Sequence, residues 1–280
     1  MTTLILQGTV ITEQDVNNIL SEISGNCVAS KNYTAIETTS EISREQVQQL
    51  RESFSFDINM LPTDFRSDET KILVTDMDST LINIECVDEI ADFINVKPQV
   101  AEITEAAMRG EIDFETSLRQ RVSLLKGLDV AALERVYTER LQLNPGAEIM
   151  LAGLKSNGIK IALVSGGFTF FTERLKQRLG LDFTMANVLG EHKGRLTGEV
   201  VGDVCGAQAK AEFLLAHCEK LDINPSQVIA MGDGANDLLM MNEAGLSIAY
   251  HAKPKVQQQA DTALNYCGLD GVLGLLQISN

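Results

Sequence analysis

The chain has 280 residues, of which 44% are hydrophobic and 22% are charged, so it is long enough for one large core and a second, smaller one. Acidic residues outnumber basic residues by 39 to 23, and the formal net charge is −16. Because nucleic-acid binding depends on clustered Lys and Arg, this charge argues against a nucleic-acid partner. A phosphate group would have to be bound locally, by a metal ion and a few selected cations.

The cysteines and histidines predict neither a disulfide framework nor a zinc site. The five cysteines are odd in number, widely spread and free of C-x-x-C pairs, which is typical of a reduced cytoplasmic protein. The three histidines do not approach zinc-ligand spacing. No basic segment opens the sequence, and no apolar run approaches the roughly 18 residues of a membrane span. We therefore expect an unexported protein without a membrane partner.

Residues 1–68 predict a small α+β domain. It combines three apolar strands with two helices whose apolar residues recur at helical spacing. In chain order these elements lie at residues 4–6, 13–23, 34–36, 44–53 and 58–61. They favour a βαββαβ order, and Pro62 with the polar stretch after it indicates a linker.

From Lys71 onward, short apolar strands alternate with helices. The strands are expected at residues 71–76, 159–165, 228–233 and 246–249. Uninterrupted apolar runs of this length suit strands that are buried on both faces of a parallel sheet. Residues 69–280 therefore predict a doubly wound α/β domain.

Two insertions interrupt this α/β pattern. Residues 85–143 are rich in Glu, Arg, Ala and Leu and are too long for one crossover helix, so we expect a helical cap between core segments 69–84 and 144–280. A cap that closes over a site excludes water from it. Residues 191–203 are Gly-rich and strand-like, which predicts a hairpin at the sheet edge.

Asp76 and Asp78 follow the first apolar strand of this domain. Ligands of open parallel sheets bind beyond the carboxyl ends of the strands, so both carboxylates can face one pocket there. One could attack phosphorus while the other protonates the leaving group and then activates water. An isolated Asp-x-Asp is more often a turn or a helix N-cap, and Ser79 or Thr80 could also supply the cap.

Residues 232–237, Gly-Asp-Gly-Ala-Asn-Asp, follow another apolar strand and favour the catalytic interpretation. The glycines permit backbone conformations that a side chain would obstruct, so Asp233 can approach the first pair and complete a Mg²⁺ site of oxygen ligands. Asp237 lies one turn later and is expected to orient those ligands more than to bind the metal directly. Taken alone, the hexapeptide could be a tight turn.

Two further positions could bind phosphate. Ser165, expected at the end of the second strand, and the backbone of Gly166 and Gly167 could donate hydrogen bonds to phosphate oxygens. Lys210 could offset the charge of the aspartates and the phosphate. Each signal is weak alone, because Ser-Gly-Gly is often a flexible turn and a single helical Lys usually lies on a solvated face.

In their order and strand context, these motifs resemble the haloacid dehalogenase superfamily of phosphotransferases. The matching positions are Asp76-x-Asp78-x-Thr80, Ser165, Lys210 and Gly232-Asp233-Gly234-x-x-Asp237. Within the superfamily the chain most resembles the phosphoserine phosphatase family, over about residues 71–275, because Glu85, Arg121 and Phe168 also match. This resemblance implies hydrolysis of O-phospho-L-serine, the last step of serine biosynthesis.

The resemblance also implies a role for each matching residue. Asp76 would be the nucleophile and Asp78 the general acid/base, with Mg²⁺ held by Asp76, Asp233 and the main-chain carbonyl of Asp78. The expected phosphate contacts are Ser165, Gly166, Lys210 and Asn236.

Glu85 and Arg121 would read the ammonium and the carboxylate of the substrate under the cap. This is chemically sensible, because Arg binds carboxylates with two hydrogen bonds and Glu can pair with an amine. Without the resemblance, both would be taken for surface charges. Met108 and Phe114 could line the same pocket or belong to the core of the cap.

The first 65 residues lie outside this match and resemble an ACT-type or another ferredoxin-like module. Such modules often bind amino acids or mediate dimer contacts. No glycine-rich ligand loop is evident in the segment, so regulation by serine and a structural role in a homodimer both remain open.

Two other functions remain open from the sequence. The same phosphoaspartate could act on another small phosphomonoester or transfer phosphate to another alcohol. Alternatively, Asp76 could be the phosphorylated residue of a receiver-like signalling switch. Asp78 and the cap argue against the switch, because receivers lack a large cap and need a long-lived acyl phosphate.

Overall fold

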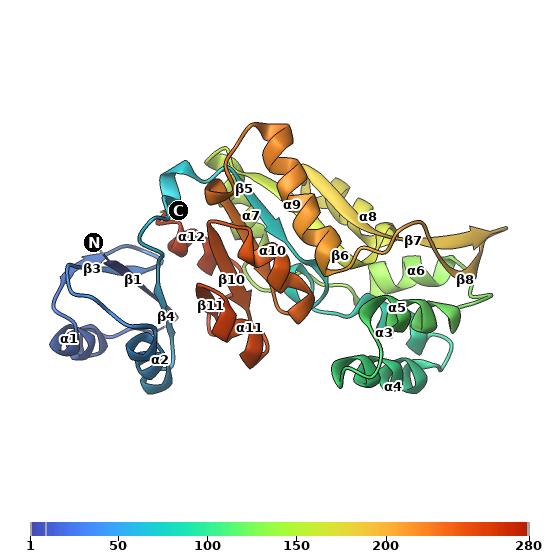
Figure 1. Ribbon diagram of the computed structural model, residues 1–280, viewed down its shortest axis with the longest axis horizontal. Helices are drawn as coiled ribbons and strands as arrows, with labels where there is room; N and C mark the ends of the chain where they lie inside the picture. Colours follow the sequence, from blue (N-terminus) through green and yellow to red (C-terminus); the bar gives the residue numbers. More distant parts are fainter. Residues whose placement is uncertain (1, 9, 279–280) are drawn as a thin grey trace.

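The computed structural model describes residues 2–8 and 10–278 and contains two separate β-sheets (Figure 1). The first sheet has the order β2-β3-β1-β4, and every neighbouring pair is antiparallel. Its elements are β1 (Thr2–Gln7), α1 (Glu13–Glu22), β2 (Asn26–Ala29), β3 (Thr34–Thr38), α2 (Arg44–Ser53) and β4 (Asp57–Met60). This is the expected βαββαβ order in a ferredoxin-like arrangement. The sequence pattern did not locate β2, because all four of its residues are exposed.

Local sequence explains where both helices of this N-terminal module begin. Thr12 caps α1 and Ser43 caps α2, each in a reciprocal capping box with the side chain three residues later. The helices then bury an apolar stripe that includes Ile19 and Val47 against Leu4, Leu6 and Ile58 of the sheet. The result is a separate small core.

The second sheet has the order β11-β10-β9-β5-β6-β7-β8, and its strands are parallel except for β8. The strands are β5 (Ile72–Thr75), β6 (Lys160–Phe168), β7 (Phe183–His192), β8 (Arg195–Val201), β9 (Val228–Gly232), β10 (Leu246–Tyr250) and β11 (Thr262–Leu264). Every residue of β5, β9 and β10 is buried. The continuous apolar runs therefore mark strands that are covered on both faces, as expected.

Helices cover the two faces of this sheet with two distinct apolar clusters. They are α7 (Ala147–Ser156), α8 (Thr169–Leu179), α9 (Ala207–Leu221), α10 (Leu238–Asn242), α11 (Pro254–Gln259) and α12 (Gly271–Leu275). Leu73 of β5 packs in one cluster with α7, α8 and α12, whereas Ile72 packs in the other with α9, α10 and α11. The domain is thus the expected doubly wound α/β fold.

Two details of this sheet differ from the sequence expectation. β6 does not end at Ser165 but runs to Phe168, with a register shift against β7 between Val164 and Phe168. The hairpin begins earlier than residue 191, because its first arm is β7 itself. Its two-residue turn, Lys193 and Gly194, has φ values of 52° and 77°, which suit the twist of a tight hairpin.

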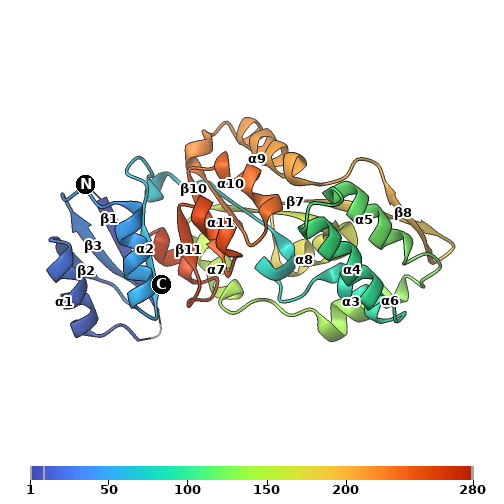
Figure 2. The same cartoon turned by 60° about the horizontal axis from the view of Figure 1, so that its bottom comes forward.

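The cap lies at the opposite end of the molecule from the N-terminal module (Figures 1 and 2). It contains α3 (Cys86–Asp92), α4 (Lys97–Met108), α5 (Phe114–Ser123), α6 (Ala131–Arg135) and a π-helical turn, η3 (Val136–Arg140). Its two connections to the core run side by side, since the Asn83 N–H donates to Gln142 O and the Asn144 N–H donates to Leu81 O, both at 3.0 Å. These paired segments fix where the cap joins the sheet.

The N-terminal module packs against β11, the edge strand of the large sheet, after a short 3₁₀ turn, η1 (Ser67–Glu69), joins the two sheets. The Asn59 side chain donates to Ala263 O at 2.9 Å and accepts from the Ala263 N–H at 2.8 Å. The Asp57 carboxylate accepts from the N–H groups of Asn265, Tyr266 and Cys267. These side chains cover a sheet edge that would otherwise expose unpaired backbone groups.

None of the helices formed by residues 2–8 and 10–278 is both long enough and apolar enough to cross a membrane.

Candidate active site

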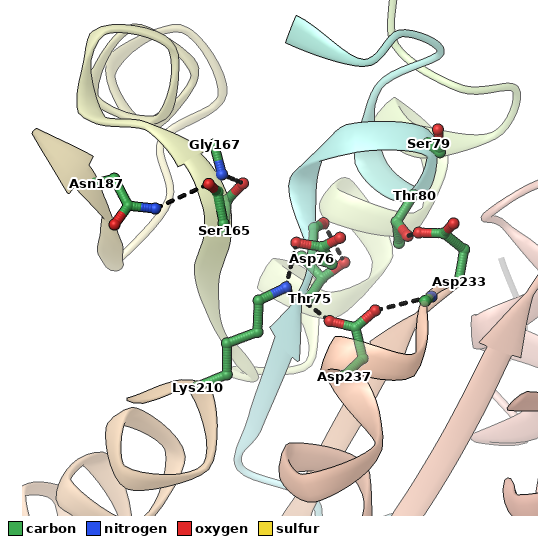
Figure 3. Close-up of polar contacts among 12 residues, drawn as sticks. Thr75, Asp76, Ser79, Thr80, Ser165, Gly167, Asn187, Lys210, Asp233 and Asp237 are labelled. Carbon is green, nitrogen blue, oxygen red and sulfur yellow. Dashed lines mark hydrogen bonds and ion pairs between the residues drawn. The ribbon is translucent and has the colours of Figure 1, made fainter. Parts of the chain in front are cut away.

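Asp76, Lys210 and Asp237 form a buried ion-pair cluster at the carboxyl end of β5 (Figure 3). Lys210 enters from the first turn of α9, and its Nζ donates to Asp76 Oδ1 at 2.6 Å and to Asp237 Oδ1 at 2.7 Å. Lys210 and Asp237 are fully buried, and Asp76 is 6% exposed. The expectation that a single helical Lys faces solvent therefore does not hold here.

The carboxylate of Asp237 is fixed by hydrogen bonds to both of its oxygens. Its Oδ2 accepts from the Gly234 N–H at 3.0 Å, so both of its oxygens have donors. A Cβ atom at Gly232 would lie 2.3 Å from Asp237 Oδ2, so only glycine fits at the end of β9. Asp237 is thus placed to orient Lys210.

The cluster holds more negative than positive charge. Burial, reinforced by Asp237 and Asp233, raises the pKa of Asp76 to about 8, although the Lys210 ammonium acts in the opposite direction. Burial and the charge of Asp237 also raise the pKa of Asp233 to about 6. Burial alone would lower the pKa of Lys210, but the two carboxylates outweigh it and keep the ammonium charged. A divalent cation would relieve this imbalance.

Three acidic side chains lie close enough to share a cation. One carboxylate oxygen each from Asp76, Asp233 and Asp237 lies within 4.8 Å of the others. Thr80 Oγ1 donates to Asp233 Oδ1 at 3.1 Å. Among the described residues, Asp76 Oδ2 and Asp233 Oδ2 accept no hydrogen bond, whereas each oxygen of Asp237 accepts one. This hard-oxygen donor set fits Mg²⁺.

Asp78 lies two residues after Asp76 with a carboxyl group suited to carry a proton. Its Oδ1 is buried and has no hydrogen-bond partner among the described residues. Burial and the charge of Glu85 raise the pKa of Asp78 well above its usual range, while hydrogen bonds from Cys86 oppose the shift. This shift favours the protonated form of the Asp78 carboxyl group.

The Ser165-Gly166-Gly167 segment lies beside Asp78. A Cβ atom at Gly167 would lie 3.1 Å from Asp78 Oδ2, so glycine permits this approach. Ser165 Oγ accepts from the Gly167 N–H at 2.8 Å, which leaves its own proton available to a ligand. The structure thus brings Ser165 to the same end of the sheet as the aspartates.

Asn187 of β7 connects this segment to the loop before Lys210. Its Nδ2 donates to Gly166 O and its Oδ1 accepts from the Cys205 N–H, both at 2.8 Å. The side chain is 1% exposed. No sequence signal singles out Asn187, because an isolated Asn within a strand has no motif around it.

Glu85 and Arg121 come from the cap side of the site. Glu85 is exposed at the start of α3, and its Oε1 accepts from Ser79 Oγ at 2.7 Å. Arg121, in α5, has no carboxylate within 4 Å of its guanidinium in the described part of the chain, and its Nε donates to Ser117 O at 3.4 Å. Burial lowers the pKa of Arg121, while the charges of Asp88 and Glu85 oppose that change. Within the described part of the chain, no carboxylate therefore competes with a ligand for this guanidinium.

Three further positions that the sequence suggested for the site, Asn236, Phe114 and Met108, lie in different surroundings. Asn236 lies in a 3₁₀ turn, η5 (Ala235–Asp237), between the two aspartates of its motif. Phe114 lies over Gly166, where a Cβ atom would be 2.9 Å from the Phe114 ring. Met108 is 64% exposed at the end of α4, so it does not belong to the cap core.

Comparison with known proteins agrees with this geometry. Residues 70–245 match the family of haloacid dehalogenase-like hydrolases. The chain is 56% identical over 225 residues to a phosphoserine phosphatase from Polaromonas sp., across 79% of this chain and 95% of the relative.

Solved structures resemble the whole chain, the N-terminal module included. A HAD family hydrolase from Salmonella enterica serovar Typhi superimposes with a TM-score of 0.91 at 31% identity, over 99% of both chains. A probable phosphoserine phosphatase from Vibrio cholerae gives a TM-score of 0.85 at 38% identity, over 99% of this chain and 87% of that one. The chain belongs to the haloacid dehalogenase-like hydrolases and, within them, to the phosphoserine phosphatase family.

Proposed function

We propose that the chain hydrolyses O-phospho-L-serine to L-serine and phosphate through a phosphoaspartate at Asp76. The observation that carries this proposal is the placement of Asp76, bonded to a buried ammonium, two residues from Asp78, whose buried Oδ1 has no hydrogen-bond partner among the described residues. The phosphoserine phosphatases at 43–56% identity support the substrate. Membership of the phosphoserine phosphatase family supports a place at the last step of serine biosynthesis.

In the first half-reaction, an oxygen of Asp76 attacks phosphorus and the P–O bond to serine breaks. The carboxyl group of Asp78 gives its proton to the departing serine oxygen. Lys210 offsets the negative charge that gathers on the phosphoryl oxygens and on Asp76.

In the second half-reaction, the Asp78 carboxylate accepts a proton from a water molecule whose oxygen attacks phosphorus. The bond between phosphorus and Asp76 then breaks, and phosphate leaves. Both aspartates return to their starting protonation states, so the proton balance closes over the cycle.

We assign the phosphate contacts to Ser165, Gly166, Lys210 and Asn236. Ser165 supports this role because its hydroxyl accepts a backbone hydrogen bond and can direct its proton to the ligand. Mg²⁺ would be held by Asp76, Asp233 and the main-chain carbonyl of Asp78. When bound, it supplies charge neutralisation and alignment of the phosphoryl oxygens.

We assign the recognition of the serine portion to Glu85 and Arg121. The carboxylate of Glu85 would bind the ammonium, and the unpaired guanidinium of Arg121 would bind the carboxylate with two hydrogen bonds. Closure of the cap over these groups would strengthen both interactions by excluding water.

The test is phosphate release with Mg²⁺ from phosphoserine, phosphothreonine and p-nitrophenyl phosphate. We expect Arg121→Ala to raise KM for phosphoserine by about tenfold or more, and to change turnover of p-nitrophenyl phosphate little. Arg119→Ala is the matched control, because Arg119 lies in the same helix and pairs with Glu115. Unchanged efficiency of Arg121→Ala toward phosphoserine would contradict the assignment. Release over many turnovers would exclude a receiver-like switch.

The division into residues 1–68 and 69–280, a homodimer through the N-terminal module and a cytoplasmic location stay predictions. The exposed edge strand β2 supports the dimer, because its outer backbone groups can pair with a second copy.

A further inference from the structure

Ser79, between Asp78 and Thr80, has a left-handed backbone conformation with φ of 56°. A residue other than glycine adopts this conformation infrequently, and it persists only where the surroundings enforce it. Two hydrogen bonds hold Ser79 here: its N–H donates to Ile84 O at 3.2 Å, and its hydroxyl donates to Glu85 Oε1 at 2.7 Å. The unusual conformation therefore directs the hydroxyl toward Glu85.

Ser79 provides the single side-chain hydrogen bond to Glu85 within the described part of the chain. No Lys, Arg or His among those residues lies within 4 Å of the Glu85 carboxylate. An exposed glutamate without such a contact would sample several rotamers, and ordering it on ligand binding would cost free energy. The hydroxyl fixes one oxygen and leaves the other free.

We propose that Ser79 is a positioning residue for substrate selection, which holds Glu85 so that its free oxygen faces the ammonium of the substrate. This inference rests on the proposed function, because it assumes that Glu85 reads an ammonium. It adds that the backbone conformation of Ser79, in the segment that follows β5, contributes to substrate selectivity. The residue between Asp78 and Thr80 therefore serves recognition, while its neighbours serve the chemistry.

Substitutions at Ser79 separate this role from a purely structural one. Ser79→Gly removes the hydroxyl but accepts a positive φ without strain, so the thermal midpoint should not fall. Ser79→Ala removes the same hydroxyl while keeping Cβ. If the hydroxyl positions Glu85, both variants should lose selectivity although their stabilities differ.

The experiment compares kcat/KM for O-phospho-L-serine with kcat/KM for 3-phosphoglycerate, which carries a hydroxyl in place of the ammonium. We expect both Ser79 variants to lower the ratio by about tenfold, mainly through KM for phosphoserine. Glu85→Gln should lower it at least as far, and the double variant Ser79→Gly/Glu85→Gln should lower it no further. Ser123→Ala is the control, because that hydroxyl donates to Gln120 O.

Two results would overturn the proposal for Ser79, and a third would also contradict the proposed substrate. The ratio could stay at the wild-type value in both Ser79 variants, or the losses from Ser79→Gly and Glu85→Gln could add. Either result would mean that Ser79 does not act through Glu85. If the wild-type enzyme itself did not prefer phosphoserine, the proposed substrate would be wrong as well, which distinguishes the two failures.

Discussion

Asp57 and Asp76 are both almost fully buried aspartates, yet their surroundings differ. Asp57, at the contact between the N-terminal module and the core, is 3% exposed and accepts from three backbone N–H groups. Asp76 is 6% exposed, and its one described donor is the Lys210 ammonium at Oδ1. Burial alone therefore does not mark a reactive carboxylate. The proposed nucleophile Asp76 differs from Asp57 in having an oxygen without a donor in the described part of the chain, next to the Lys210 ammonium.

Asp237 shows the same contrast inside the active site. It is as buried as Lys210, but its two oxygens are occupied by Lys210 and by the Gly234 N–H. Because each oxygen of Asp237 already accepts one hydrogen bond, this carboxylate is better placed to orient Lys210 than Asp76 is to orient a neighbour. Asp76 and Asp237 thus differ in how many of their oxygens accept a hydrogen bond from the described residues.

The largest effect is expected from removing the Lys210 ammonium, which Asp76 has beside it and Asp57 lacks. Lys210→Met leaves Asp76 and Asp237 buried without a counter-charge, so it should lower kcat by about 10²–10³-fold and destabilise the fold by about 3–5 kcal/mol. Steady-state kinetics and urea unfolding measure these changes. Lys220→Met, at an exposed position of the same helix, is the control. Wild-type stability in Lys210→Met would show that the buried Asp76 and Asp237 do not need the charge of Lys210.

A smaller effect, confined to stability, is expected at Asp57, where the N-terminal module contacts the core. Asp57→Asn replaces an acceptor of three N–H groups with an amide that brings its own donors, so unfolding should become easier by about 2–4 kcal/mol. The kcat of the folded enzyme should stay within about twofold. Asp64→Asn, at an exposed position in the connecting segment, controls for the loss of charge. A large fall in kcat would show that the docking contact also shapes the active site.

The pH dependence of stability should report the raised pKa of Asp233 in the metal-free site. The folded protein keeps a proton on Asp233 up to about pH 6, whereas the unfolded chain loses it near pH 4. The folded state therefore binds more protons between these values, and this residue lowers stability as pH rises through that window. In EDTA, Asp233→Asn should reduce the fall between pH 4 and 7 by on the order of 2–3 kcal/mol. Equal slopes in thermal unfolding of both proteins would argue against a raised pKa.

The smallest effect is expected at Thr80, which acts on the site through Asp233. Thr80→Val keeps the side-chain volume but removes the hydroxyl that donates to Asp233 Oδ1. We expect Mg²⁺ affinity to fall by about tenfold, with the protein still folded. Isothermal titration with Mg²⁺ measures it, and an unchanged affinity would mean that Thr80 does not orient Asp233.

Much of the fold follows from the sequence because the apolar runs are long and regular. The apolar pattern locates the β5, β9 and β10 strands, and the ends of the predicted strands point to Asp76 and Asp233. β2 was missed because it buries no residue, and the extension of β6 depends on a register shift with β7.

Other features depend on contacts between distant residues. The burial of Lys210 follows from a partner 134 residues away, and the role of Asp57 follows from backbone groups 208–210 residues away. No local pattern carries that information. The same holds for Asn187, whose two partners are brought together only when β6, β7 and α9 assemble.

The most direct test of the central claim is to trap the covalent intermediate. The enzyme is mixed with phosphoserine and Mg²⁺, quenched in acid within milliseconds, digested and analysed by mass spectrometry. We predict that the peptide containing Asp76 gains the mass of one phosphoryl group, and that Asp76→Asn abolishes both this label and turnover. Turnover without a labelled peptide, or a label that persists in Asp76→Asn, would contradict the account.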